Sequence, residues 1–423
     1  MSEAPDVENT ENAENTENTE VVESDVCIVG AGPAGLTLAL LLLRSGLRVS
    51  VVERSRSHQR EFRGEILQPG AMRILDQLGV LEDARARGCH EHSRFRLVEQ
   101  DRVLLDIDYR SLPAPYNHLL SIPQSHLLGE LLLHCGRFSG FRHVEGCRVG
   151  GLLRDDGGRV TGVTADDHAF HAKVVVGADG RFSKVRRLAG IEAGRTEAFD
   201  QDVLWFKLRG ERSEGGRDVR VFRGAGTSPV LVYGSWPDNV QVGWTLPHKG
   251  YRKVAQGGLG HIKAQLARAV PAYATLIDDQ ITSLRDLSLL DVFSGRAERW
   301  AVDGLVLIGD AAHTHSPIGA QGINLAVQDA VVLHPLLVES VRREDAGVEF
   351  LSRFERLRAP DIAAMMRLQG IQSKAMLSTG TFATKVRPRL AAVVRHTPLY
   401  RRILRTIAYG NPSIRVAEEL FVL

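Results

Sequence analysis

An acidic side chain followed by a long run of small and turn-forming residues marks the stretch GDAAHTHSPIGAQG, residues 309–322. It comes directly after the apolar run GLVLI, residues 304–308, which is typical of a buried strand. A connection between strand and helix usually takes about 2–6 residues, so this one is long. Asp310, at the predicted strand end, can accept hydrogen bonds from the hydroxyls of a polyol chain. Composition and length therefore indicate a loop on which a ligand can lie close to the backbone.

The second half of this loop favours recognition by the backbone. Its turn residues are Pro317, Gly319 and Gly322. Their N–H groups can point at the edge of a ring, and the helix expected from about Asn324 would aim the positive end of its dipole at negative charge developing there. His313 and His315 have no third ligand nearby, so we expect both to shape the loop and we expect no metal site.

A second candidate ligand site is the stretch GAGPAG, which ends an apolar run and opens a helical pattern. Its members are Gly30, Ala31, Gly32, Pro33, Ala34 and Gly35. The first glycine permits a tight turn, the second lets the backbone approach a pyrophosphate, and the third lets helix and strand pack closely. Glu53 ends the next predicted strand, where a carboxylate can accept hydrogen bonds from ribose hydroxyls. These features favour a dinucleotide site over a plain glycine-rich turn, and the acid favours FAD or NAD over NADP.

A third stretch, VVVGADGRFSKVRR, places Asp179 and Gly180 at the end of another apolar run. Arg181, Ser183 and Arg186 follow closely. Asp-Gly is also a common turn sequence, because both residues tolerate unusual backbone angles. On the residues alone, a simple turn and a ligand site are equally open.

The three stretches, in this order and at these wide spacings, resemble the motifs of the group A FAD-dependent monooxygenases, the para-hydroxybenzoate hydroxylase-like family. The resemblance covers roughly residues 24–190 and 286–345. The resemblance implies contacts with every part of FAD. The ADP half would be bound by Gly30, Gly32, Pro33, Ala34, Gly35 and Glu53, with Arg54 beside the adenosine and Arg63 near the pyrophosphate. Asp310 would bind the ribityl chain, Gln124 would contact the flavin, and the isoalloxazine ring would lie along Pro317, Gly319, Gly322, Ile323 and Asn324. The resemblance also associates Asp179 and Gly180 with both FAD and reduced nicotinamide.

The sequence departs from the family pattern at Ala320, where the family usually has glycine. A methyl group there is expected to be tolerated and to tighten the loop. We also expect no counterpart of the thioredoxin-like extra domain that the longer phenol hydroxylases carry. There is no second GxGxxG, which fits a family in which NAD(P)H visits the flavin without a domain of its own.

The resemblance implies an enzyme in which NADPH or NADH reduces FAD. Reduced flavin would react with O2 to give a C4a-hydroperoxide, which would hydroxylate an electron-rich aromatic or polyketide-like small molecule. This chemistry belongs to the cofactor, and the protein orients it and excludes water. A base that deprotonates a phenol would help, but the sequence identifies no catalytic residue.

Two other functions remain open. A flavin-dependent halogenase or an isoprenoid double-bond reductase would share the same FAD domain. Halogenases of this type generally carry Trp-x-Trp-x-Ile-Pro, whereas Val242–Pro247 reads VGWTLP and has one tryptophan. The other alternative is a non-catalytic flavin-binding assembly partner that uses its acidic N-terminus and basic C-terminus for contacts.

The pattern of elements predicts an α/β fold in which a Rossmann-like FAD-binding parallel-sheet domain carries an inserted antiparallel β-sheet substrate domain and a C-terminal helical segment. The expected divisions are a disordered acidic tail at 1–23, the FAD-binding domain at 24–190 plus 286–345, the antiparallel sheet at 191–285, and the helical segment at 346–423. Three aromatic residues lie on the antiparallel strands: Trp205, Tyr233 and Trp244. They are candidates for a substrate pocket, although packing on the other face of the sheet is the favoured alternative.

Composition is that of a soluble globular protein, with 43% hydrophobic and 25% charged residues among 423. The formal net charge is +2, but the first 25 residues hold nine acidic residues and no Lys or Arg, which leaves about +11 on the rest. A basic body suits an anionic ligand. No basic stripe interleaves with aromatic residues, so we expect no nucleic-acid partner.

The cysteines and the apolar runs bear on location. Four cysteines are scattered without metal spacing, at Cys27, Cys89, Cys135 and Cys147, which predicts a reduced, cytoplasmic protein. No signal peptide is evident, and the run Leu38–Leu43 is far too short for a membrane span. The C-terminal segment is basic, with Arg387, Arg389, Arg395, Arg401, Arg402 and Arg405 among apolar residues. Peripheral membrane contact is open there, although a solvated helical face is favoured. The oligomeric state is not predicted.

Overall fold

The computed structural model describes residues 19–56, 64–99, 102–196, 201–210, 217–224, 228–377 and 397–422. An eight-stranded sheet has the order β19-β20-β11-β1-β2-β8, with β10 and β9 attached beside β11. Its strands are β1 (Glu20–Val29), β2 (Val49–Glu53), β8 (Phe141–Glu145), β9 (Val149–Arg154), β10 (Val160–Ala165), β11 (His168–Gly177), β19 (Ala301–Val302) and β20 (Leu305–Leu307). The five strands from β20 to β8 run parallel, which confirms the expected parallel-sheet domain.

Helices cover this sheet because its central strands are buried on both faces. The helix α1 (Pro33–Arg44) is apolar around nearly its whole circumference and packs against α9 (Gly322–Arg343) and α4 (Gln124–Cys135). The long helix α10 (Val348–Leu377) packs on α9 and beside β19 and β20. These packed helices fix the positions of the loops that leave the strand ends.

Strand β1 begins earlier than the sequence suggests. Glu20 already pairs with His168 of β11, and its carboxylate lies 2.7 Å from a guanidinium nitrogen of Arg142. The expected disordered tail at 1–23 is therefore wrong for Glu20–Glu23, because β11 extends far enough to pair with them. Residues 1–18 lie outside the described residues.

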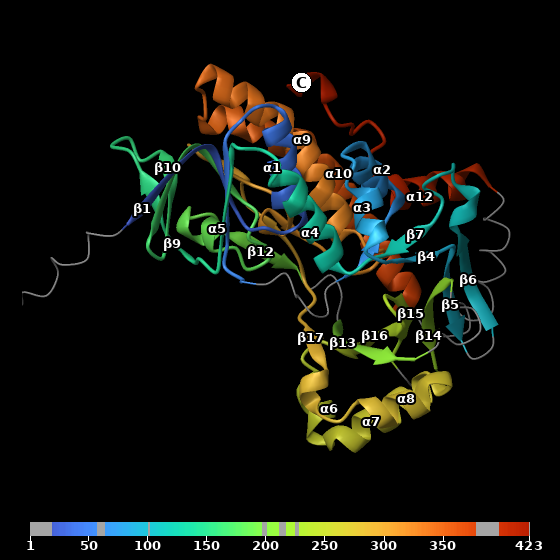
Figure 1. Cartoon of the computed structure of the whole chain (residues 1–423). Helices are drawn as coiled ribbons and strands as arrows, with labels where there is room; N and C mark the ends of the chain where they lie inside the picture. Colours follow the sequence, from blue (N-terminus) through green and yellow to red (C-terminus); the bar gives the residue numbers. More distant parts are fainter. Residues whose placement is uncertain are drawn as a thin grey trace, which may run out of the picture.

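A second sheet of seven strands lies below the larger body in Figure 1, with the order β17-β13-β16-β15-β14-β5-β6. Its strands are β5 (Arg94–Glu99), β6 (Arg102–Asp108), β13 (Gln201–Arg209), β14 (Asp218–Arg223), β15 (Val230–Ser235), β16 (Asn239–Pro247) and β17 (Ser288–Leu290). All neighbouring strands are antiparallel except β14 and β5. From the sequence, the antiparallel sheet is expected to be formed by residues 191–285 alone. The structure differs, because β5 and β6, which lie much earlier in the chain, complete this sheet.

The two faces of the second sheet have different neighbours because side chains alternate along each strand. Leu204 and Phe206 pack against α7 (Gly258–Ala269) and α8 (Ala274–Gln280), which lie beneath the sheet together with α6 (Tyr251–Gln256) in Figure 1. Val203 and Trp205 face the larger body instead. The second sheet therefore presents one face to the first domain and the other to its own helices.

Short elements join the two bodies. One three-stranded sheet contains β3 (Ile66–Leu67), β7 (Leu119–Ser121) and β4 (His90–His92), and another contains β12 (Ala193–Thr196), β18 (Ser294–Ala297) and β21 (His313–Thr314). The remaining helices are α2 (Pro69–Gln77), α3 (Leu81–Ala86), α5 (Lys184–Leu188) and α12 (Pro398–Tyr409). In the described part of the chain, no helix has the length and apolar character needed to cross a bilayer.

A buried charged network holds the 309–322 loop from behind. Asp329 of α9 is fully buried, and one of its oxygens accepts hydrogen bonds from the Gly309 N–H at 2.9 Å and from Nε2 of His313 at 2.7 Å. The other oxygen accepts from Nε of the buried Arg358 at 2.7 Å. Burial alone would raise the pKa of Asp329, but the charges of His313 and Arg358 lower it to about 2. The carboxylate thus stays ionised and fastens the loop to α9 and α10.

We predict that Asp329→Asn lowers the unfolding free energy by about 3–5 kcal/mol, because it removes the fully buried carboxylate that pairs with Arg358 and leaves this guanidinium the partly exposed Asp361 as its acidic partner. Chemical denaturation followed by circular dichroism measures the loss. The matched control is Glu339→Gln on the same helix, whose ion pairs with Arg343 and Arg353 are partly exposed. That change should cost less than about 1 kcal/mol. Equal losses in the two variants would contradict the role given to the buried network.

We also predict that stability falls as the pH drops below about 6.5. Burial, and then the neighbouring His313, lower the pKa of His315 to about 3, and burial lowers the pKa of His334 to about 4. In the unfolded chain both imidazoles take up protons near pH 6.5, so unfolding binds protons between that pH and the folded values. The unfolding free energy should fall by about 1.4 kcal/mol per pH unit for each histidine in this window.

Denaturation midpoints measured across this pH window test the prediction. His334→Asn should make the dependence of the unfolding free energy on pH shallower, because unfolding then takes up one proton instead of two. The ionised Asp329 carboxylate stabilises the fold at every pH above its unfolded pKa, and this stabilisation is lost only as the pH falls toward 2. It therefore does not alter the pH dependence that the two histidines cause at higher pH. Stability that stays flat between about pH 6.5 and pH 4 would refute the prediction.

Candidate functional site

The three stretches singled out in the sequence meet at one edge of the parallel sheet. They follow β1, β11 and β20, which are neighbours in the sheet order, and β2 ends beside them. The N–H groups of Gly30, Ala178 and Ile308 donate to carbonyl oxygens of adjacent strands at 2.8, 2.8 and 3.0 Å. Ligands of open α/β sheets bind outside the carboxyl ends of the strands, and this edge is such a place.

The GAGPAG loop has the geometry that its glycines predict. Gly30 has φ +110°, and a Cβ there would lie 2.5 Å from the carbonyl oxygen of Ala178. A Cβ on Gly35 would lie 2.0 Å from the Gly30 carbonyl oxygen, so helix and strand pack closely here. Gly32 is the N-cap of α1, and a Cβ there would meet nothing within 4 Å. Pro33 begins the helix. Only the Gly32 position faces open space.

Glu53 lies at the end of β2 with a buried carboxylate. One oxygen accepts from the Ala31 N–H at 2.9 Å and the other from the Ser55 N–H at 3.0 Å. Because an ionised carboxylate has about four acceptor positions, both oxygens can also take ribose hydroxyls. Arg54 is exposed beside it, while the predicted contact Arg63 lies outside the described residues.

Asp179 acts as a helix cap in this structure. Its carboxylate accepts from the hydroxyl of Ser183 and from the N–H groups of Lys184 and Val185, the latter two at 2.6 and 3.1 Å. The turn interpretation of this stretch therefore has direct geometric support. Gly180 has φ +84° and a Cβ there would meet nothing within 4 Å, so the turn also borders open space.

Two arginines of the Asp179 stretch reach across to the 309–322 loop. Arg186 donates to the Ala311 carbonyl oxygen at 2.8 Å. Arg181 lies 3.8 Å from a carboxylate oxygen of Asp310, whose side chain is about one-third exposed. The two motifs are thus linked directly, and Asp310 remains accessible at the strand edge, as its predicted role requires.

Side chains missed in the sequence hold the far end of the 309–322 loop. Gln68, just before α2, donates to the Gly319 carbonyl oxygen at 2.8 Å, and its own N–H donates to Oδ1 of Asn324 at 2.9 Å. Asn324 in turn donates to the Ala320 carbonyl oxygen at 2.6 Å, and Tyr109 donates to Gln68 at 3.2 Å. The Asn324 side chain is occupied by the loop, so a ligand here would meet backbone atoms. No local sequence signal marks buried amides of this kind.

The loop is under backbone strain at one position. Ala320 has φ +51°, a left-handed conformation that costs a residue with a Cβ about 1–2 kcal/mol. The glycine usual in the family would avoid this cost, so the departure noted in the sequence has a physical consequence. A Cβ on Gly322 would meet nothing within 4 Å, and Ile323 and Pro317 are half-buried beside it.

Gln124 occupies the first position of α4 and is buried. Its amide donates to the Gly64 carbonyl oxygen at 2.9 Å, and a Cβ on Gly64 would meet nothing within 4 Å. The side chain therefore orients a backbone segment that borders open space, between the parallel sheet and β3.

FAD fits this edge by the shape of the backbone. The glycines whose Cβ positions are open, Gly32, Gly180 and Gly322, come from all three stretches. The N-termini of α1 and α9 carry no side-chain cap and no acidic residue in the first turn. Uncapped helix N-termini accept phosphate and other negative charge through their N–H groups.

The aromatic candidates separate onto two faces of the second sheet. Trp205 and Tyr233 belong to an apolar group between that sheet and the 309–322 loop, which we call the junction cluster. Its buried members are Ile66, Tyr109, Leu112, Leu119, Val203, Trp205, Val219, Tyr233, Val292, Ile318, Leu404 and Ala408. Trp244 packs among the residues that contact α7 and α8. The pocket expectation is therefore wrong for Trp244, because the side-chain alternation along β16 turns it to the opposite face.

A polar group beside the junction cluster ties the two bodies together. The buried Glu65 pairs with Lys207 of β13, at 2.5 Å, and accepts from the Ser235 hydroxyl at 2.7 Å. Burial, and then the charge of Glu65, raise the pKa of Tyr233 well above its usual range. Tyr233 therefore remains a neutral phenol at physiological pH.

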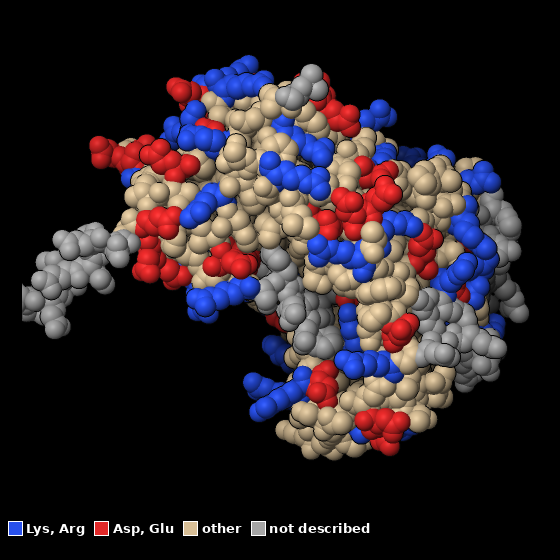
Figure 2. Space-filling view, viewed as in Figure 1, with Lys and Arg blue, Asp and Glu red and all other residues tan. Residues whose placement is uncertain are grey.

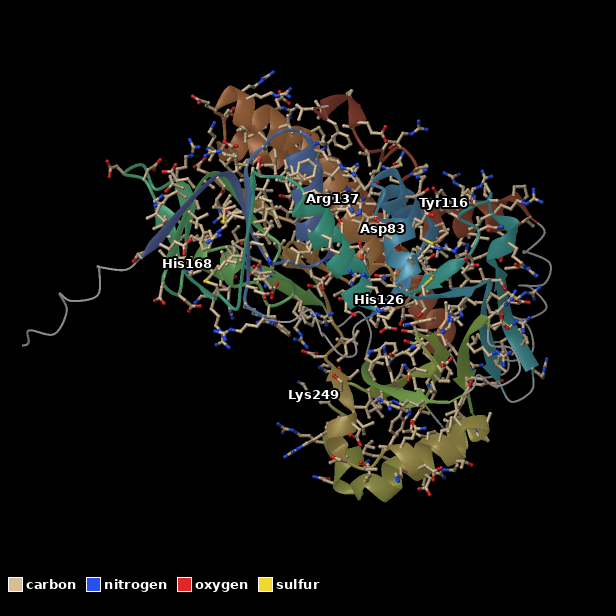
Figure 3. The ribbon with its side chains drawn as sticks, viewed as in Figure 1. Asp83, Tyr116, His126, Arg137, His168 and Lys249 are labelled. Carbon is tan, nitrogen blue, oxygen red and sulfur yellow. The ribbon has the colours of Figure 1, made fainter. Side chains whose placement is uncertain are left out.

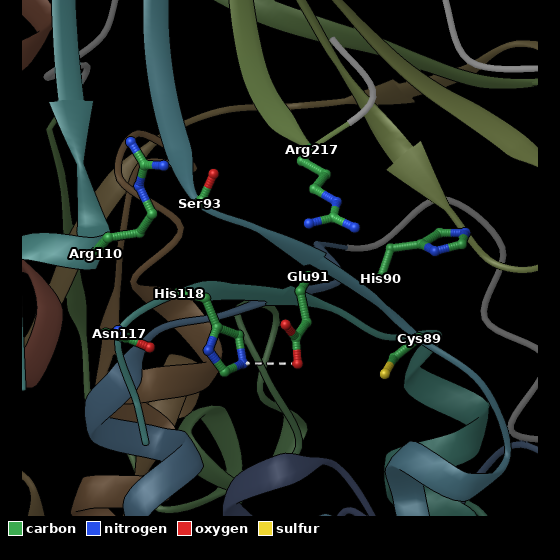
Figure 4. Close-up of a pocket in the computed structure, with 8 residues that line it drawn as sticks. All are labelled: Cys89, His90, Glu91, Ser93, Arg110, Asn117, His118 and Arg217. Atoms are coloured by element: carbon green, nitrogen blue, oxygen red, sulfur yellow. Dashed lines mark ion pairs between the residues drawn. The ribbon is translucent and has the colours of Figure 1, made fainter. Parts of the chain in front are cut away.

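A cavity of about 520 Å³ lies away from this edge, and Figure 4 shows the residues that line it. Its lining residues are Cys89, His90, Glu91, Ser93, Arg110, Asn117, His118 and Arg217. Nε2 of His118 lies 3.6 Å from a Glu91 oxygen. None of the expected FAD contacts lines this cavity, so the geometry and chemistry of the strand edge outweigh it as the active site.

Two clusters in the described residues have spacings that suit a metal ion. In the first, Asp83 pairs with His134 at 2.7 Å and Glu130 pairs with Arg87; Asp83 is labelled in Figure 3. The second joins Asp202, His248 and Asp291. Asp202 there accepts from His248 and from two backbone N–H groups, and Asp291 pairs with a guanidinium. Both clusters are thus engaged by protein partners.

Comparisons with known proteins identify the family of the chain. Residues 23–369 match a family model described as FAD binding domain. The chain is 57% identical over 401 residues to 6-methylpretetramide 4-monooxygenase of Streptomyces rimosus, which covers 94% of this chain and 95% of that protein.

Two solved structures share the fold. The crystal structure of a probable FAD-dependent monooxygenase from Pseudomonas aeruginosa has a TM-score of 0.74 and 24% identity, covering 88% of this chain and all of that one. The anhydrotetracycline hydroxylase from Streptomyces rimosus also has a TM-score of 0.74 and 24% identity, covering 94% and 78%. The matched family and the relative of nearly equal length confirm the resemblance seen in the motifs: the chain belongs to the FAD-binding-domain family, and it is a FAD-dependent monooxygenase.

Proposed function

We propose that this monooxygenase uses NADPH or NADH and O2 to hydroxylate a planar, fused-ring aromatic polyketide of the pretetramide type. The observation that carries the proposal is the 57% identity, over nearly the whole of both chains, to an enzyme named for 6-methylpretetramide. At such identity over such length, the walls of the active site are expected to be largely shared.

The junction cluster supports a flat apolar substrate. Trp205 and Tyr233 present aromatic side chains to the side on which Ile318 of the loop lies. Aromatic surfaces pack well against fused rings, and a site with few polar groups excludes water from the reaction. The substrate would then lie between the second sheet and the loop expected to carry the flavin.

The roles of the chain's own residues follow from the geometry. Bound FAD, once reduced by the nicotinamide, supplies the oxygen-transfer chemistry. Glu53 and the GAGPAG backbone would hold the ADP half, and Asp310 would accept from the ribityl chain. Gly319 and Gly322 would set the plane of the ring, with Gln68 and Asn324 fixing the loop. Trp244 lies on the opposite face of the second sheet, so the one tryptophan of the VGWTLP run does not point toward this site.

We predict that the FAD-loaded protein, given NADPH, O2 and 6-methylpretetramide, yields a product with one added oxygen atom, measured by mass spectrometry. Without the polyketide, NADPH consumption should be slow and should yield hydrogen peroxide. Added bromide tests halogenation in the same reaction and should leave the product unchanged. A flavin that neither NADPH nor NADH reduces in the presence of the polyketide would overturn the proposal. Hydroxylation of single-ring phenols but not of the fused-ring compound would overturn the substrate class alone.

A second prediction concerns Glu53. Glu53→Gln removes the charge that favours hydrogen bonds from ribose hydroxyls, and such charged bonds contribute about 1.5–3 kcal/mol. The dissociation constant for FAD, measured by quenching of flavin fluorescence, should rise about 10- to 100-fold. The matched control is Glu145→Gln on the neighbouring strand β8, which is paired in register with Glu53 but exposed. An unchanged affinity in Glu53→Gln would show that this carboxylate does not bind the cofactor.

A further inference from the structure

The helix α12 forms part of the wall of the junction cluster. Leu404 and Ala408 are buried within that cluster, while Arg401, Arg402 and Arg405 are exposed on the outer face. Figure 2, which shows one face of the molecule, has basic and acidic residues interspersed over much of its surface. The described part of the basic C-terminal segment is thus a helix with an apolar inner face and a solvated outer face.

The C-terminal end of α12 rests on residues of the cofactor side. The last four carbonyl groups of a helix have no partner within the helix. Of these, the Ile407 carbonyl oxygen accepts from Nε2 of Gln321 at 2.8 Å, and the Tyr409 carbonyl oxygen accepts from Nε2 of Gln328 at 3.1 Å. Both donors belong to the segment that carries the loop and α9. The helix is therefore capped by the flavin-binding domain.

Gln321, unlike Gln328, also forms a hydrogen bond with the 309–322 loop. Its amide nitrogen also donates to the Gly319 carbonyl oxygen at 3.1 Å, and its side chain is only 2% exposed. A carboxamide has two N–H donors, so one can hold the loop while the other holds α12. Gln328 lies further along α9 and bonds to Arg358 instead of the loop. Gln321 is thus a direct connection between the loop and the helix.

The loop at this point is conformationally demanding. Gly319 has φ +75° and Ala320 has φ +51°, and Gln321 follows immediately as the N-cap of α9. A small change in these angles would rotate the Gln321 side chain away from α12. A ligand that favours one loop conformation therefore also favours one arrangement of its bonds.

We propose that Gln321 is a positioning residue that couples FAD binding on the 309–322 loop to the order of α12, the helix that covers the substrate side. The proposal rests on the function proposed above, since it assigns the loop to FAD and the junction cluster to substrate. FAD fixes the loop, the loop fixes the Gln321 amide, and the amide fixes the end of α12. By linkage the effect is reciprocal, so contact of substrate with Leu404 stabilises the FAD-binding form of the loop.

Hydrogen exchange of α12 tests the coupling without any substrate. In the full-length wild type, saturating FAD should slow amide exchange in residues 398–409 about tenfold, within the usual range of coupling between sites. In Gln321→Leu, which removes both donors at similar size, FAD should still bind but should slow this exchange less than about twofold. The control is Tyr409→Phe, which removes a tether from α12 to Pro113 and Tyr116 that does not involve the loop. Its exchange should be faster overall, with the FAD-dependent change retained.

Each outcome decides the proposal. If FAD leaves α12 exchange unchanged in the wild type, or if Gln321→Leu keeps the full FAD effect, the coupling is overturned. The wild-type measurement decides even if the leucine variant does not fold. A second readout is the ratio of oxygenated product to NADPH consumed, which should fall at least fivefold in Gln321→Leu if the helix excludes water. Failure to oxygenate a polyketide would overturn the proposed substrate but would leave the exchange result standing, so the two failures are distinguishable.

Discussion

The carboxylate of Asp329 holds together segments that the chain order keeps far apart. It binds the N–H of Gly309 and the ring of His313 on the loop, and the guanidinium of Arg358 on α10. In a dry interior such a charge is stable only when its partners stay in place, because an unpaired buried charge is costly. Asp329 thereby fixes the first half of the loop, while Gln68 and Asn324 hold the second half, where Ala320 has its left-handed backbone angle.

The ligand edge is built mainly from backbone, and its conspicuous side chains are largely structural. Asp179 caps α5, Arg186 fixes the Ala311 carbonyl, and Asn324 holds the loop carbonyl of Ala320. Glycine positions then provide the open surface that a flat, charged cofactor needs. Glu53 and Asp310 are the acids that we propose for contacts with the cofactor at this edge. Because the cofactor side consists mainly of backbone held by hydrogen bonds, it is rigid. The substrate side is formed by apolar side chains of the junction cluster, which differ more easily between enzymes.

The motifs predicted the parallel sheet, the cofactor edge and the family, because glycine spacing and strand-end acids are local signals. The sequence did not indicate that β5 and β6 complete the second sheet, since that pairing joins segments more than a hundred residues apart. Trp205 and Trp244 looked equivalent, and only the pairing register with its two-residue alternation separates their faces. Gln68 and Gln321 had no signal at all, because a buried amide is recognised by its partners and not by its neighbours in sequence. The contacts of the candidate residues with FAD itself remain predictions.

The order of the strands along the chain has a consequence for folding during translation. β1, β2 and β11 are made early, but β20, which pairs with the C-terminal half of β11, is synthesised only after the whole second sheet. Until β20 is made, the nascent chain exposes the edge of β11 that β20 later pairs with. The 309–322 loop, Asp329 and Arg358 have not yet been synthesised at this stage. Exposed strand edges associate with other chains, and long-range pairing is slow. The incomplete chain therefore exposes a strand edge that favours association with other chains until β20 is made, and the Asp329–Arg358 pair can form only after translation has passed α10.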